Sequence, residues 1–159
     1  QLQGRDPGTR VRAVALSSFP SNPLCWAFAS VEQKGPDFRV SRGVASIAPS
    51  IVGAHSCPAA FAEPEAQRAL SPAVAIVWEQ QTPLAELLGR KQQDCYFDAW
   101  LRFARSPALN ADNATDVRFG DDPDSNFATI RHAAFAGKPC PAGVPQWGYP
   151  RADLLEPGS

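Results

Sequence analysis

The chain has 159 residues, a length that predicts a single domain with a core large enough to fold without a structural metal. Apolar residues make up 44% and charged residues 19%, a combination that argues against an intrinsically disordered chain. Fifteen basic residues against sixteen acidic ones give no indication of nucleic-acid binding, and no apolar run approaches the roughly 20 residues that cross a bilayer.

The start of the sequence favours a fragment cut from a longer protein. There is no Met, not even at position 1, and no signal-peptide pattern. Residues 1–9 contain two glycines and a proline without periodicity, and they are interpreted as a leader. Polar and apolar residues then alternate from Arg10 towards Leu16, which predicts a strand.

Residues 24–47 have the pattern of a β-hairpin. Leu24, Trp26 and Phe28 alternate with small residues, so these three side chains share one face of a strand. A Gly-Pro turn then leads into a second apolar strand, in which Gly43 indicates a bulge. We expect the large face of the first strand to be buried against the helices that follow.

Two helix-start signals follow a loop over residues 48–71. Ser71 before a proline predicts a helix from there to about Gln81, because proline is favoured at the first helical position. Thr82 before Pro83 repeats the signal, and leucines at helical spacing follow it up to Gly89. The segment therefore predicts two short helices, or one helix broken before Pro83.

The last third of the chain predicts a strand meander and a tail. Residues 98–108 fit either a helix or a strand, and a strand is favoured. Residues 116–119 and 126–133 are expected to be further strands, separated by an acidic turn. The Pro- and Gly-rich residues 134–159 are expected to form an extended tail that lies over the domain.

Strands, then helices, then strands predict an α+β fold with a mainly antiparallel sheet of about five to six strands and two or three short helices. The expected domain covers residues 10–133. Sixteen prolines also favour such a loop-rich fold over a helical bundle.

The four cysteines leave several redox states open. Cys25, Cys57, Cys95 and Cys140 contain no CxxC pair, which disfavours a zinc site. Two disulfides, one disulfide with two buried thiols, and four free thiols all remain open. If a disulfide forms, the favoured pair is Cys57 with Cys140, because both precede a proline in turn-like surroundings where loops meet.

Few residues carry a specific chemical signal. His55 and His132 are far apart in the sequence and form no metal-binding pair, and there is no GxSxG motif for a serine hydrolase. The acidic residues 121–126 lack the Gly and Glu of a calcium loop. Trp147 and Tyr149, flanked by Gly and Pro, either line a groove or cap the sheet.

Three short segments resemble a known family. Residues 20–26 read Pro-x-Asn-x-Leu-x-Trp, residues 100–105 read Trp-Leu-Arg-Phe-Ala-Arg, and residues 116–120 read Asp-x-Arg-Phe-Gly. Over residues 10–132 the chain resembles the C-terminal soluble part of the membrane-bound metal-dependent hydrolases of bacterial inner membranes.

The resemblance implies that His and Asp ligands for a divalent metal lie in a preceding membrane-embedded part, and that residues 1–9 are a leader after a removed membrane segment. It implies no metal or cofactor in this chain, an extracytoplasmic (periplasmic) position, and the chain's own membrane-embedded N-terminal region as its partner.

Three functions follow as hypotheses. The favoured one is a non-catalytic domain that covers or assists the membrane-embedded site. A self-contained hydrolase would place its site under loop 48–71 and tail 134–150, where ionisable groups would line a cleft. The third is a non-enzymatic binding or assembly module.

Overall fold

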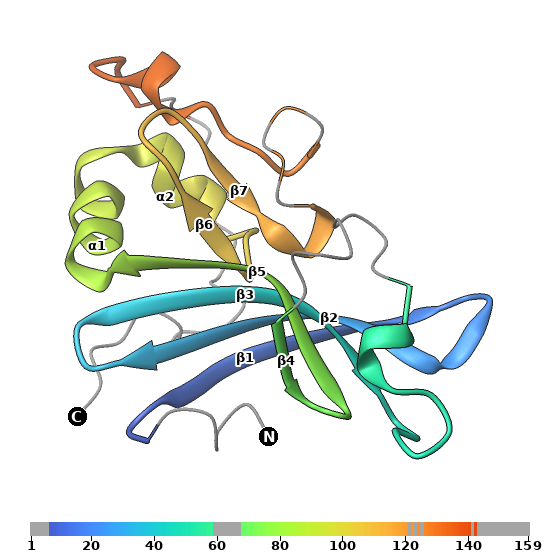
Figure 1. Cartoon of the computed structure of the whole chain (residues 1–159). Helices are drawn as coiled ribbons and strands as arrows, with labels where there is room; N and C mark the ends of the chain where they lie inside the picture. The colour runs from blue at the N-terminus through green and yellow to red at the C-terminus, as the bar shows by residue number, and fades with distance from the viewer. Residues whose placement is uncertain are drawn as a thin grey trace.

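The computed structural model describes residues 7–58, 68–120, 122, 124, 126–140 and 142. It shows an α+β fold in two layers, which confirms the predicted class (Figure 1). The lower layer in the figure is a five-stranded antiparallel sheet. Its strands, in spatial order, are β1 (Arg10–Phe19), β2 (Asn22–Lys34), β3 (Asp37–Ser46), β5 (Val74–Pro83) and β4 (Arg68–Ser71).

The second layer packs on one face of this sheet. It consists of two consecutive helices and a small two-stranded sheet (Figure 1). These elements are α1 (Leu84–Gln93), α2 (Cys95–Leu101), β6 (Pro107–Leu109) and β7 (Ala114–Asp116). Among the residues described, no helix is both long and apolar enough to cross a membrane.

The predicted hairpin over residues 24–47 is confirmed. Strands β2 and β3 pair without a break from Cys25 to Lys34, and Gly35 in the turn between them has a φ of 57°, which favours glycine. The expected bulge at Gly43 is also present, since the register of β3 with β5 shifts between Arg42 and Gly43.

The expected burial of the large face of β2 against the helices is wrong. Ala29 and Val31, on the opposite face, belong to the core beneath α1 and α2, whereas Trp26 is half-exposed. Phe28 is buried, but its ring lies over Gly43 of β3. Ala29 and Val31 therefore face the second layer, and the larger side chains of this strand lie on the other face of the sheet.

The helix expected after Ser71 is also wrong, because the segment forms strand β5. Pro72 and Ala73 instead form the turn between β4 and β5, and the hydroxyl of Ser71 at the end of β4 accepts a hydrogen bond from the amide of Ala73 at 3.2 Å. The apolar run that follows pairs with β3 on one side and with β4 on the other, so it forms an interior strand of the sheet.

The second helix-start signal is confirmed. Helix α1 begins directly after Pro83, buries Leu84 and Leu87, and continues past Gly89. The strand favoured over residues 98–108 is wrong for its first part, which belongs to α2. Asp94 caps that helix by accepting hydrogen bonds from the amides of Tyr96 and Phe97 at 2.8 and 3.1 Å.

The predicted meander is reduced to the β6–β7 hairpin. The strand expected over 116–119 ends at Asp116, because its carboxylate accepts from the amide of Arg118 and turns the chain into a short 3₁₀ helix. The strand expected over 126–133 is wrong, since only a single bridge joins Ile130 to Ala114, and a 3₁₀ helix (His132–Phe135) follows.

The main core lies between the sheet and the second layer. It contains buried residues from β2, β3, both helices, the β6–β7 hairpin and the 3₁₀ helix after it: Ala29, Val31, Phe38, Val40, Leu84, Leu87, Phe97, Leu101, Ala108, Leu109, Ala114 and Val117. A smaller cluster at the far end of β2 consists of Cys25, Val44, Ala54, Cys57 and Ala75.

Candidate functional site

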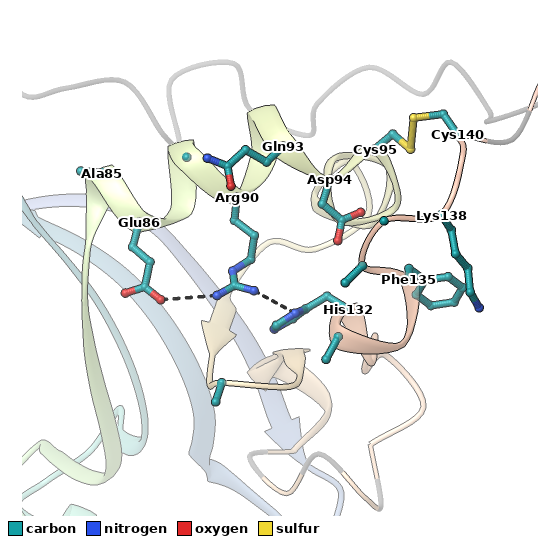
Figure 2. A pocket seen from close by; sticks show the side chains of 15 residues that line it. Ala85, Glu86, Arg90, Gln93, Asp94, Cys95, His132, Phe135, Lys138 and Cys140 are labelled. Carbon is teal, nitrogen blue, oxygen red and sulfur yellow. Dashed lines mark hydrogen bonds and ion pairs between the residues drawn. A yellow bond between two sulfur atoms is a disulfide. The ribbon is translucent and has the colours of Figure 1, made fainter.

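A pocket of about 760 Å³ lies between helix α1 and the segment 132–140 (Figure 2). Its walls combine charged side chains from the helix with backbone and side chains of the segment. The residues that line it are Ala85, Glu86, Gly89, Arg90, Gln93, Asp94, Cys95, Ala111, His132, Ala133, Phe135, Ala136, Gly137, Lys138 and Cys140.

His132 is the one buried polar side chain among these residues. Its Nε2 lies 3.3 Å from the carbonyl oxygen of Asn110, and its Nδ1 lies 2.9 Å from Nη1 of Arg90. A carbonyl only accepts, and a guanidinium only donates, so Nε2 carries the hydrogen and Nδ1 is the acceptor. Both ring nitrogens are therefore used, and neither is oriented to bind a metal or to abstract a proton.

Arg90 projects from α1 into the pocket between Glu86 and His132 (Figure 2). Its Nη2 lies 3.8 Å from the Glu86 carboxylate one turn earlier, and the two side chains are 30% and 48% exposed. An exposed pair at this distance is weak. The closest partner of the guanidinium is therefore a neutral imidazole nitrogen.

The segment 132–140 is attached to α2 at several points. The Cys95–Cys140 disulfide joins it to the first residue of that helix, with a Cα–Cα distance of 5.9 Å. The ring of Tyr96 stacks on Phe135 at 4.4 Å, and its hydroxyl donates to the carbonyl of Pro139 at 3.3 Å. These contacts fix the wall of the pocket opposite α1.

The second disulfide lies away from the pocket. Cys25 of β2 is bonded to Cys57, which follows a short 3₁₀ helix (Ala54–Ser56), and both cysteines are buried. The predicted pairing of Cys57 with Cys140 is therefore wrong. The two cysteines lie in different parts of the molecule, and each is bonded to a cysteine other than the predicted one.

All four cysteines are thus in disulfides, with none free. Two disulfides that use every cysteine of the chain indicate an oxidising, extracytoplasmic environment.

The remaining predicted site residues do not come together. His55 lies exposed in the 3₁₀ helix near Cys57, and Trp147 and Tyr149 lie outside the described residues, as do loop residues 59–67. Within the described part of the chain, no three His, Cys, Asp or Glu residues are grouped as a metal site would need.

The Asp-x-Arg-Phe-Gly segment forms a corner outside the pocket. The buried Asp116 carboxylate accepts the amide of Arg105 at 3.0 Å and pairs with the guanidinium of Arg118 at 2.6 Å. That guanidinium lies 4.8 Å from the ring of Phe119. Next to this corner, the exposed rings of Phe103, Phe119 and Phe127 follow one another in contact.

Sequence reasoning missed Arg90 and considered His132 only as a metal ligand. The spacing of Glu86 and Arg90 after Pro83 places both on one helix face, and this signal is readable in the sequence. No local pattern links Arg90 to a histidine 42 residues away.

Comparison with protein-family models, with curated proteins and with solved structures returned no match. The resemblance to the membrane-bound metal-dependent hydrolases therefore stays a prediction.

Proposed function

We propose that this chain is the extracytoplasmic domain of a membrane-bound metal-dependent hydrolase of the bacterial inner membrane. In this role it covers or assists a membrane-embedded metal site and contributes no catalytic residue. The observation that carries the proposal is the pairing of all four cysteines, which suits a domain outside the cytoplasm.

The state of His132 supports a non-catalytic role. A general base needs a ring nitrogen free to reach a proton, and a metal ligand needs a free lone pair. Both nitrogens of His132 are occupied by Asn110 and Arg90. A hydrolase contained in this chain would have to use other groups.

The exposed rings of Phe103, Phe119 and Phe127 provide a surface for the membrane-embedded partner. They are 38%, 43% and 77% exposed and form a continuous aromatic cluster. Contiguous exposed apolar side chains are typical of docking surfaces. We propose that this aromatic cluster contacts the membrane-embedded region of the same protein.

Thiol counting and metal analysis test the proposal. Protein exported to a bacterial periplasm, denatured without reductant, should contain no reactive thiol, and after dialysis it should hold no stoichiometric zinc or manganese. Four reactive thiols in that material would contradict the extracytoplasmic position. One retained metal ion per chain would contradict the non-catalytic role and favour the self-contained hydrolase.

The aromatic cluster is tested in the full-length protein. Replacing Phe119 and Phe127 with serine should lower its hydrolase activity without loss of the fold, whereas the same change at exposed Ile47 and Ile51 should not. Equal effects of the two double variants would contradict the assignment of this surface.

A further inference from the structure

We propose that the pocket beside α1 binds a small organic carboxylate through Arg90. The inference rests on the geometry of the pocket alone and does not depend on the proposed function. The volume of about 760 Å³ is within the usual range for sites that hold small molecules.

The first argument concerns the charge of Arg90. Its nearest partner, Nδ1 of His132, is a neutral acceptor that orients the guanidinium without neutralising it. Among the described residues its only ion-pair partner is Glu86, which is half-exposed and 3.8 Å away. The positive charge and the remaining N–H groups are therefore available to an anion that enters the pocket.

The second argument concerns pre-organisation. His132 is 2% exposed and donates from Nε2 to Asn110, so its ring is fixed with Nδ1 towards the pocket. If Arg90 turned away, this buried nitrogen would lose its donor, at an energetic cost. The guanidinium is thus held in place before a ligand arrives, which lowers the entropic cost of binding.

The third argument concerns the class of anion. Two carboxylates, Glu86 and Asp94, line the pocket together with the two cations Arg90 and Lys138. A singly charged carboxylate meets one guanidinium in the bidentate geometry that Arg favours, whereas a phosphate dianion meets more repulsion from the two acids. Apolar surface for the organic part of the ligand comes from the alanines that line the pocket, Ala85, Ala111, Ala133 and Ala136.

Titration with 3-phenylpropionate, followed by ¹H–¹⁵N NMR of the oxidised chain, tests this proposal. We expect saturable shifts at the Arg90 side chain and at the amides of residues 132–138. The uncharged analogue 3-phenylpropionamide should produce much smaller shifts, because it lacks the carboxylate.

Three variants locate the interaction. Arg90→Gln should weaken binding about tenfold or more, as expected for loss of a charge-assisted contact. Glu86→Gln should strengthen it about twofold, because it removes the competing carboxylate from an exposed i, i+4 pair. Arg68→Gln is the matched control, since it removes an exposed arginine that is paired with Glu79 on the main sheet.

The variants also keep the test decisive. If Arg90→Gln does not fold, Glu86→Gln still decides, since it changes an exposed side chain. Equal binding of the amide, no change in Glu86→Gln, or equal weakening in Arg68→Gln would each overturn the proposal. Tighter binding of phenyl phosphate than of 3-phenylpropionate would overturn the assignment to carboxylates.

Discussion

Gly43 lies directly beneath the ring of Phe28, so that a Cβ at position 43 would be 2.5 Å from Phe28 Cζ and 2.3 Å from the carbonyl oxygen of Ala75. The backbone of β5 provides the second of these contacts, and it does not give way as a flexible side chain would. Gly43→Ala should therefore lower the free energy of unfolding by about 3 kcal/mol, measured by urea denaturation.

Gly89→Ala is the matched control. Gly89 is inside α1, has no positive φ, and a Cβ there would have no neighbour within 4 Å. Alanine should stabilise the helix, raising the free energy of unfolding by about 0.5–1 kcal/mol. Similar effects of the two substitutions would show that the close contact under Phe28 is not present in solution.

The two disulfides should differ in their resistance to reduction. Cys25 and Cys57 are 0% and 3% exposed, whereas Cys140 is exposed at the surface. Because thiol–disulfide exchange requires access to a sulfur atom, graded reduction should open Cys95–Cys140 first. Alkylation of the released thiols followed by mass spectrometry measures the order, and earlier labelling of Cys25 would contradict it.

Removal of the buried disulfide should destabilise the whole domain. The Cys25–Cys57 bond closes a loop with a sequence separation of 32 residues. When both cysteines are replaced with alanine, the chain-entropy model predicts that the free energy of unfolding falls by about 4 kcal/mol for such a loop. Thermal unfolding of the double variant measures the loss, and an unchanged melting temperature would argue against this pairing.

Removal of the exposed disulfide should act on the pocket. In the double variant Cys95→Ala with Cys140→Ala, the stacking of Tyr96 on Phe135 remains, but the segment loses its covalent attachment to α2. Amide hydrogen exchange within residues 133–138 should therefore increase, while exchange in the paired strands β2 and β3 should not. An equal increase in both regions would mean that this disulfide supports the global fold.

Asp116 should be the most sensitive carboxylate in the β7 corner. It is fully buried, accepts the amides of Arg105 and Arg118, and pairs with the Arg118 guanidinium. Asp116→Asn leaves that guanidinium without its anion. It should lower the free energy of unfolding, measured by chemical denaturation, by about 3–5 kcal/mol.

The control for this substitution is Asp124→Asn. Asp124 pairs with Arg131, and both side chains are more than two-thirds exposed. Loss of the Asp124 charge should change the free energy of unfolding by less than about 0.5 kcal/mol. A comparable loss in both variants would contradict the central role of Asp116.

Local signals predicted the parts of the fold that local chemistry determines. The turn before Asp37 connects two apolar strands, and the turn fixes their register, so the hairpin is readable from sequence. Pro83 likewise starts α1 as expected. Pro72 carries the same signal but is followed by β5, because the buried run after it pairs on both sides. Propensity does not reveal such tertiary pairing.

The site was less predictable than the fold. Arg90 and His132 meet because α1 and the C-terminal segment pack together, and neither residue has a neighbour in sequence that indicates the contact. The predicted disulfide pairing was wrong for the same reason. Prolines beside a cysteine indicate a loop, but they do not show which other cysteine lies next to that loop in the fold. The Arg90–His132 contact and the disulfide pairing both depend on which segments lie close together in the fold, and residue types alone do not show this.

The two disulfides follow one another along the chain: the first cysteine is bonded to the second, and the third to the fourth. When a chain is exported with its N-terminus first, Cys25 and Cys57 emerge before Cys95. An oxidase that joins each cysteine to the next one to appear then produces the native bonds directly, because no intervening cysteine competes. If this chain is exported in that way, its correct oxidation should need no disulfide isomerase, and the first loop should close before the pocket residues have been exported.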